Sequence, residues 1–320
     1  MPGFIPVIHG RAVADRPDEA DTLANAQVIA HALERLGYVS DIIEIDLDLT
    51  AVEKLANRRP RAAFNLVEGI RGDGALGHVV CAAMDHFGVP YTGAKTEAYL
   101  VSSSKLLSKA ALLAAGLPSP KHWLREAPAG EGKVIVKSVS EHASFGMDQK
   151  SIVESGLAAA EIAAREEKFG GKFFAEQYIP GREFNIAVLE TNDGPRVLPM
   201  AEMAFDGLPP GVAPIIDYAA KWDEESPSYH LMTRRFGIEE QEPQLAAKLR
   251  ALTLDCWHAG GLSGYARVDF RVDERGEPYI LEFNANPCLA PDAGFAAALD
   301  RASMAYEEGV SAIVNAALAA

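Results

Sequence analysis

Two β-rich segments near the carboxyl end of the chain constrain its fold more than any other feature. The first contains Arg267 and Asp269 two residues apart, and the second contains Glu282 and Asn284 at the same spacing. The turn-forming stretch 273–277 between them predicts a hairpin. Because side chains alternate along a strand, the four polar side chains would share one face of this hairpin. The opposite face would hold the apolar side chains of Val268, Phe270, Leu281 and Phe283.

These four polar side chains are typical of a site that handles phosphate. The oxygens of Asp269, Glu282 and Asn284 are hard ligands that suit Mg²⁺ held against phosphate. The guanidinium of Arg267 beside them would neutralise a developing oxyanion or a phosphoryl group. An ordinary hairpin with a solvated polar face would carry the same pattern, so the other motifs of the chain have to decide between the two interpretations.

The composition favours a multi-domain globular protein that binds a small molecule. With 320 residues and 48% hydrophobic content, the chain can form more than one core. Its formal net charge of −15 repels nucleic acid and anionic membranes, so neither is expected as a partner. Three cysteines without metal-ligand spacing fit a reducing compartment. Because residues 1–30 lack a leader pattern and no long apolar run follows, we expect a cytoplasmic protein.

The amino-terminal part of the chain alternates strand and helix patterns. Such alternation indicates a parallel sheet with helices on both faces, which is a Rossmann-like α/β domain. We expect this domain to span residues 1–95. The predicted strands are 4–9, 39–45, 62–67 and 89–91, and the predicted helices are 21–36, 51–57 and 76–87.

The remainder of the chain reads as α+β, and we expect two further domains at 96–182 and 183–320. A loop at 141–147 contains Ser144 and Gly146, and a long polar excursion covers 207–233. The other predicted elements are helices at 103–115, 155–169, 244–259 and 302–317 and strands at 133–139 and 173–178.

Four further motifs precede the hairpin in a fixed order. They are Gly-Val-Pro-Tyr-Thr-Gly at 88–93, Ser-Lys at 104–105 with Lys109, Ile-Val-Lys at 135–137 followed by Ser144-x-Gly146, and Glu-x-x-Ile-x-Gly-Arg-Glu-Phe at 176–184. With these motifs the chain resembles the ATP-grasp superfamily, and within it the D-alanine–D-alanine ligase group. The resemblance extends from the first strand to Pro287 and implies a three-domain ATP-grasp architecture.

The resemblance implies an ATP site built from several parts of the chain. Lysines at strand and helix ends would hold the nucleotide phosphates, and the glycine-containing loop would fold its N–H groups over them. The implied ATP-binding residues are Lys105 and Lys137 with Ser144 and Gly146 for the phosphates, Glu183 for the ribose, and Glu176, Gln177, Ile179 and Leu281 around the adenine.

The resemblance also implies the reaction, which joins a small carboxylate to a small amine through an acylphosphate. Two Mg²⁺ ions, with Mn²⁺ as the alternative, would be held by Asp269, Glu282 and Asn284. Arg267 would stabilise the tetrahedral oxyanion, and Lys221 on a mobile lid would reach the γ-phosphate. Relatives are commonly homodimers, so the resemblance implies that state here.

The substrate positions depart from the family pattern. The glycine loop carries Ala143 and the lid carries Trp222 where D-alanine ligases have a serine and a tyrosine, and Glu19 flanks the position of their ammonium-binding glutamate. In the second subsite Cys288 replaces a glycine and Ala293 replaces a serine. Asn65 or Glu68, at the end of a buried strand, either binds a substrate or has a capping and turn role. These departures predict substrates other than two D-alanines.

Three alternatives stay open at the level of sequence. The first is a true D-alanine–D-alanine ligase whose pocket has drifted. The second is a nucleotide-binding regulator without activity, against which the complete polar set of the hairpin and both lysines argue. The third is a phosphotransferase that stops at the acylphosphate, because the sequence does not prove that an amine site exists.

Overall fold

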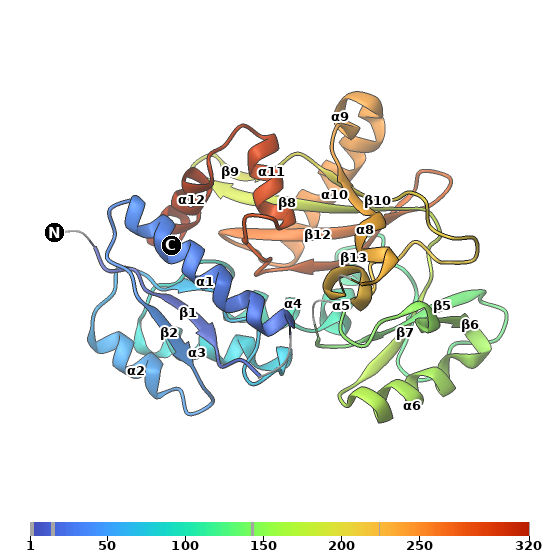
Figure 1. The fold of residues 1–320 in the computed structure, drawn as a ribbon, viewed down its shortest axis with the longest axis horizontal. Coiled ribbons are helices and arrows are strands. Elements are labelled where there is room, and N and C mark those ends of the chain that lie inside the picture. Colours follow the sequence, from blue (N-terminus) through green and yellow to red (C-terminus); the bar gives the residue numbers. More distant parts are fainter. Residues whose placement is uncertain (1–2, 14–16, 142–143, 224, 320) are drawn as a thin grey trace.

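The chain forms three sheets with helices packed around them (Figure 1). The computed structural model describes residues 3–13, 17–141, 144–223 and 225–319, without the side chains of 17–21, 227 and 228. None of the helices in this described part combines the length and the apolar content needed to cross a lipid bilayer.

The amino-terminal sheet is parallel, as predicted. Its strands are β2 (Ile42–Ile45), β1 (Val7–Gly10) and β3 (Phe64–Asn65), in that order. The chain between them forms α1 (Pro17–Arg35), α2 (Thr50–Asn57) and α3 (Gly77–Phe87). The predicted fourth strand at 89–91 is wrong, because only a single bridge joins Tyr91 to Ala63.

A second, four-stranded antiparallel sheet follows. Its order is β4 (His122–Trp123), β7 (Phe173–Gln177), β5 (Lys133–Ser138) and β6 (Ile152–Glu154), and α6 (Ala158–Phe169) packs on it. Two helices precede this sheet, α4 (Thr96–Ser102) and α5 (Lys105–Ala114), and the sequence predicted only the second. Because the side chain of Ser104 accepts a hydrogen bond from the Leu107 N–H, Ser104 marks a new helix start.

The third sheet has six strands and comes from the carboxyl half of the chain. Its order is β11 (Met232–Arg235), β10 (Ala201–Phe205), β8 (Arg182–Thr191), β12 (Tyr265–Val272) and β13 (Pro278–Asn284), and β9 (Gly194–Val197) pairs with β8. Besides two short helices between β10 and β11, this half contains α9 (Ile238–Gln241), α10 (Pro243–Ala259), α11 (Gly294–Arg301) and α12 (Tyr306–Ala319). The predicted domain limits near residues 95 and 182 stay a prediction.

The hairpin predicted from the sequence is β12 and β13. Arg267 pairs with Asn284, and Asp269 pairs with Glu282, so the four polar side chains occupy adjacent positions. After Asp269 the register shifts, and Ile280 rather than Leu281 lies opposite Phe270. A bulge therefore turns Leu281 out of the core, where the sequence had placed it, and the fully buried Ile280 takes that place.

The polar excursion predicted at 207–233 is only partly irregular. It contains two short helices, α7 (Tyr218–Trp222) and α8 (Pro227–Leu231), and it leads into the edge strand β11. Asp217 accepts a hydrogen bond from the Ala220 N–H at 2.9 Å and so caps α7. The segment is thus a folded lid over the edge of the third sheet.

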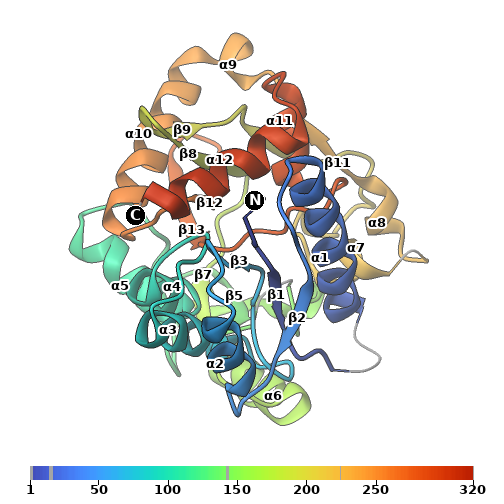
Figure 2. The ribbon, with the colours of Figure 1, turned by 90° about the vertical axis from the view of Figure 1, so that its left-hand side faces the viewer.

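Two apolar cores hold the third sheet in place. On one side, Phe184, Ile186, Val268 and Phe270 pack with residues of α5 and α10. The second core combines residues of β1, α1 and β3 with residues of β8, α11 and α12, so the amino-terminal sheet and the carboxyl-terminal helices are packed as one body. Figure 2 shows α1 and α12 side by side.

Candidate active site

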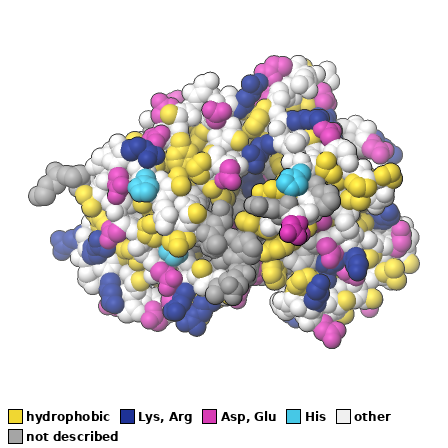
Figure 3. All heavy atoms as spheres, viewed as in Figure 1, with side chains coloured by type: hydrophobic (Ala, Val, Ile, Leu, Met, Phe, Trp, Pro, Cys, Tyr) yellow, Lys and Arg dark blue, Asp and Glu magenta, His cyan; other side chains and the backbone are white. Residues whose placement is uncertain are grey.

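A cavity of about 500 Å³ lies between the second and third sheets and reaches the amino-terminal sheet. Figure 3 shows one face of the molecule, on which basic and acidic side chains are interspersed rather than gathered by sign. Of the predicted site residues that the structure describes, the cavity is lined by Glu68, Lys105, Lys137, Ser144, Glu176, Gln177, Ile179, Glu183, Lys221, Trp222, Arg267, Asp269, Leu281, Glu282, Asn284, Cys288 and Ala293.

Three adjacent strands supply the polar wall of this cavity. In β8 and β12, Asn185 pairs with Asp269 and Glu183 pairs with Arg271, while β13 places Glu282 opposite Asp269 on the other side. Since alternate residues of these strands enter the apolar core, the polar residues share the remaining face. The strand pairing therefore brings polar and charged side chains from distant parts of the sequence into adjacent positions.

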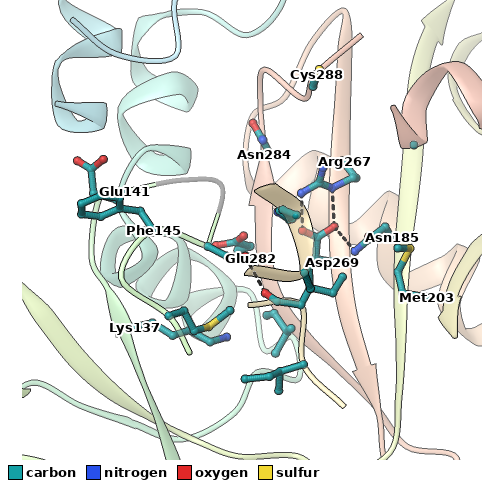
Figure 4. Close-up of a pocket in the computed structure, with 18 of the residues that line it drawn as sticks. Lys137, Glu141, Phe145, Asn185, Met203, Arg267, Asp269, Glu282, Asn284 and Cys288 are labelled. Carbon is teal, nitrogen blue, oxygen red and sulfur yellow. Dashed lines mark hydrogen bonds and ion pairs between the residues drawn. The ribbon is translucent and has the colours of Figure 1, made fainter. Parts of the chain in front are cut away.

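Asp269 is the most constrained member of this wall. Its two oxygens accept hydrogen bonds from Nε and Nη2 of Arg267 at 2.7 and 2.8 Å, and Oδ1 also accepts from Nδ2 of Asn185 at 2.9 Å (Figure 4). Burial lowers the pKa of Arg267, but Asp269 outweighs it and raises that pKa overall. The guanidinium thus stays charged inside the cavity.

The other two predicted metal ligands lie beside a lysine and a backbone N–H. Nζ of Lys105 is 3.4 Å from Glu282 Oε2 and donates a hydrogen bond to the backbone oxygen of Glu141 at 2.8 Å. Oδ1 of Asn284 accepts a hydrogen bond from the Asn286 N–H at 2.8 Å. Both side chains are only partly buried, so their oxygens are within reach of a cavity ligand.

Glu176 forms a buried ion-pair network with two lysines. Its Oε1 accepts from Nζ of Lys137 at 2.8 Å, and its Oε2 pairs with Nζ of Lys109. Although burial opposes it, the two lysines hold the pKa of Glu176 below its usual range. Lys109 also donates to the backbone oxygen of Leu281 at 3.2 Å, which ties the second sheet to the third. The network thus keeps Lys137 in a fixed position at the cavity wall.

Glu183 forms a second buried ion pair. Its Oε2 accepts from Nη1 of Arg271 at 3.3 Å, and burial raises the pKa of Glu183 above its usual range. Arg271 also donates to the backbone oxygens of Ile179, Gly181 and Pro214. This arginine therefore fixes the connection between β7 and β8, where Gln177 and Ile179 line the cavity.

The predicted phosphate loop is joined to the lid. Ser144 has a φ of 62° and Gly146 a φ of 69°, so the loop turns through the left-handed region twice. Ser144 Oγ donates to the backbone oxygen of Ile216 at 2.7 Å, and the Tyr218 N–H donates to that of Met147 at 3.1 Å. These bonds connect lid and loop in a chain that lacks the two family hydroxyls.

The lid places Lys221 and Trp222 in the cavity wall. Burial lowers the pKa of Lys221, and the positive charge of Arg267 lowers it further. A cation in such a position favours a ligand of negative charge.

The amino-terminal sheet contributes a third wall. Gly10 ends β1 against the backbone of Gly69, where any side chain on Gly10 would overlap the Gly69 oxygen. Glu68 therefore lies in the cavity wall beside this contact. Asn65, the alternative substrate residue of this strand, is buried and accepts from the Val67 N–H at 3.1 Å, so it has a turn role. Ala143 and the Glu19 side chain lie outside the described residues.

The loop after β13 supplies a further part of the cavity wall. Cys288 and Ala293 line it, and Cys288 is a partly exposed free thiol. His9 and His78 bond to backbone oxygens and do not line the cavity. Gly146 lies behind the phosphate loop, against Phe169 and Phe173.

Sequence reasoning missed three residues that shape the site, and it assigned no role to a fourth, Lys109, although Lys109 belongs to one of the motifs. Arg271 lies two residues after Asp269, just as Asp269 lies two residues after Arg267. The alternation of side chains along a strand could therefore have predicted that Arg271 shares their face. Lys109 lies one helical turn after Lys105. Asn185 and Arg234 gave no signal, because only the pairing of distant strands brings them to the cavity.

The donor set at the hairpin fits a hard divalent cation. Within the described residues no group of three or more His, Cys, Asp or Glu side chains gathers, so a site made of carboxylates alone is not formed. Two carboxylates and an amide oxygen on neighbouring positions, with room for phosphate oxygens, match the partly completed shell that Mg²⁺ takes when it binds with a nucleotide.

Comparison with solved structures supports this arrangement. The D-alanine–D-alanine ligase of Bacillus anthracis, solved in complex with ATP, is similar with a TM-score of 0.76, covering 99% of this chain and 98% of that one at 18% identity. The protein has the ATP-grasp fold, as expected from the sequence, with its parallel sheet at the amino terminus. The fold and the cavity are those expected of an ATP-dependent carbon–nitrogen ligase, and the sequence comparisons assign the chain to that class.

The sequence comparisons give the family. Residues 130–315 match the family model described as D-ala D-ala ligase C-terminus. The D-alanine–D-alanine ligase of Acidiphilium cryptum is 30% identical over 84% of each chain, and that of Moorella thermoacetica is 31% identical over 93% of this chain and 94% of its own. The chain belongs to the D-alanine–D-alanine ligase family, and it is an ATP-dependent ligase that forms an amide bond.

Proposed function

We propose that this ligase joins a small carboxylate to a small amine through an acylphosphate and releases ADP and phosphate. The observation that carries the proposal is the three-strand polar wall. It places Arg267, Asp269, Glu282 and Asn284 in one cavity with Lys105 and Lys137. We also propose that the enzyme acts in the cytoplasm as a homodimer.

In this proposal the nucleotide lies between the second and third sheets. Lys105 and Lys137 bind phosphate oxygens, and the loop at Ser144 offers its N–H groups to them. Gln177, Ile179 and Leu281 surround the adenine, and Glu183 accepts from the ribose. Asp269, Glu282 and Asn284 hold two Mg²⁺ ions, which neutralise phosphate charge when bound.

The residues of the chain then have separate tasks in the reaction. An oxygen of the donor carboxylate attacks the γ-phosphorus while Lys221 neutralises the transferred group. The amine attacks the acyl carbon of the acylphosphate, and Arg267 stabilises the oxyanion of the tetrahedral adduct. That adduct collapses to the amide and expels phosphate. The lid excludes water, which would otherwise hydrolyse the acylphosphate.

The acyl donor lies near the wall formed by the amino-terminal sheet. Glu68 is the carboxylate of that wall and is suited to binding an ammonium group of the donor. Trp222, in place of a tyrosine, makes the lid side of this subsite more apolar. A true D-alanine–D-alanine ligase is also consistent with the family, so D-alanine belongs among the tested donors and acceptors.

The proposal is tested with a panel of amino acids of both hands, supplied singly and in pairs with Mg·ATP. We expect phosphate release that requires both a carboxylate and an amine, and a product whose mass equals the sum of the pair less one water. Phosphate release with a donor alone, together with a trapped hydroxamate, would instead indicate a phosphotransferase.

Glu282→Gln tests the role of the hairpin. We expect phosphate release to fall by more than the roughly 100-fold that loss of an outer-shell partner costs. Glu277→Gln is the matched control, because Glu277 lies at the exposed end of the same hairpin and makes its ion pair with Lys248. Unchanged phosphate release in Glu282→Gln would refute the metal assignment.

A further inference from the structure

The edge strand β11 carries an arginine into the wall formed by the loop after β13. Arg234 lies opposite Met203 in the pairing of β11 with β10, and both line the cavity. The next residue, Arg235, lies opposite Glu202, which does not line the cavity, and it pairs with Asp206. Because side chains alternate along β11, Arg234 faces the cavity and Arg235 faces the surface.

Arg234 is in contact with the loop that follows β13. Its Nη1 donates to the backbone oxygen of Asp292 at 3.3 Å, and its Nε lies 3.7 Å from the point where a side chain on Gly294 would begin. Within the described residues no carboxylate comes within ion-pair distance of Arg234, whereas Arg182, Arg235 and Arg267 each have one. Its positive charge is therefore compensated less than theirs.

The electrostatic surroundings of Arg234 favour an anion. Partial burial lowers the pKa of Arg234, and the positive charge of Arg267 lowers it further, while the carboxylate of Asp292, which lies beyond ion-pair distance, offsets only part of this. A guanidinium cannot relieve this by losing its proton, because its pKa remains far above neutrality. Arg267 is already paired with Asp269, so Arg234 is the cation that an incoming carboxylate can bind through two parallel hydrogen bonds.

Resting on the ligase function proposed above, we propose that Arg234 determines the specificity for the amine substrate by binding a carboxylate on it. Arg267, to which the proposed function gives the tetrahedral oxyanion, is near enough to Arg234 for its charge to lower the pKa of Arg234. The hairpin beside it holds the activated end of the donor, and Glu68 lies at the amino-terminal wall. The wall of Arg234, Asp292 and Gly294 is left for the second substrate. In this proposal Arg234 makes the enzyme prefer an acceptor with a free carboxylate over one whose carboxylate is blocked as an amide.

The test compares amino acids with their primary amides as acceptors, using the pairs that the wild-type enzyme joins. Arg234→Met should raise the KM for the amino acid roughly 10- to 100-fold, the range expected for loss of a charged hydrogen bond. The KM for the amide and the KM for ATP should not change. Arg234→Lys should recover part of the loss, since lysine keeps the charge without the fork of donors.

Arg235→Met is the matched control, because Arg235 lies on the same strand and faces away from the cavity. It should leave every KM within twofold of the wild-type value. Three outcomes overturn the proposal: an unchanged amino-acid KM in Arg234→Met, an equal loss for acid and amide, or a loss confined to the donor. A wild-type enzyme that joins no pair at all would overturn the proposed function, and the inference with it.

Discussion

At the scale of single residues, the central finding is that Asp269 is shared between partners. Both of its oxygens accept from Arg267, and Oδ1 also accepts from Asn185. A divalent cation at Asp269 would compete with Arg267 for the same oxygens, because each carboxylate oxygen has a limited number of acceptor sites. Metal binding would thus weaken the ion pair between Arg267 and Asp269. The guanidinium of Arg267 could then interact more strongly with the substrate.

Lys221 gives a prediction about pH. Burial and Arg267 lower the pKa of Lys221 in the folded enzyme. The ammonium therefore loses its proton at a lower pH than an ordinary lysine, and kcat/KM for Mg·ATP should fall as the pH rises through that value, below 10.5. The guanidinium introduced by Lys221→Arg would stay protonated, so the alkaline decline should disappear in that variant. A wild-type profile that stays flat to pH 10.5 would contradict this role.

At the scale of elements, the site is the product of strand pairing. The hairpin could be predicted from the sequence because two short patterns with the same spacing flank one turn. The contribution of β8 could not, because Asn185 lies 84 residues before Asp269 and nothing local marks their pairing. The bulge at Leu281 was also beyond prediction, since a bulge is defined only by the register of the partner strand.

The structure of the lid also depends on contacts with distant parts of the chain, which the sequence does not reveal. The composition of the lid predicted a long polar excursion, and the structure has α7, α8 and the start of β11 within it. The hydrogen bonds that order it come from Ser144 and Met147, about 70 residues earlier in the chain. Contacts of this kind are tertiary and override local preference.

Asn185→Ala tests whether β8 supports the metal ligands. The change removes one donor to Asp269, and we expect about 10- to 100-fold more Mg²⁺ to be needed for half-maximal phosphate release. Asn192→Ala, in the exposed turn that leads from β8 to β9, is the control for loss of an asparagine. The role of Asn185 is refuted if both variants show the same Mg²⁺ dependence as the wild type.

At the scale of the whole molecule, a buried polar network joins the first sheet to the third. The hydroxyl of Tyr265 in β12 donates to Oδ1 of Asn286, whose Nδ2 donates to the hydroxyl of Tyr99 in α4 at 3.3 Å. Tyr99 in turn donates to the backbone oxygen of Val67, the residue before Glu68. The Asn286 N–H holds the side chain of Asn284. One network therefore positions the wall of Glu68 and the predicted metal ligand Asn284 together.

Tyr265→Phe tests this network. It leaves Oδ1 of Asn286 without its donor in a buried site, so the free energy of unfolding should fall by about 1–3 kcal/mol in urea denaturation. The control is Tyr279→Phe, because in the described part of the chain the Tyr279 hydroxyl makes no hydrogen bond. Equal stability of the two variants would show that the network carries no stabilising energy.

The shared core of the first sheet and the last helices has a consequence for any shortened form of this protein. Ile5, Ile29 and Phe64 pack against Phe295 and Ile313, from the other end of the chain. A fragment that begins at residue 130 would expose those apolar faces of α11 and α12 to water, although it would contain the whole hairpin. Such a fragment should aggregate, and nucleotide binding should be recovered only when the amino-terminal residues are supplied with it.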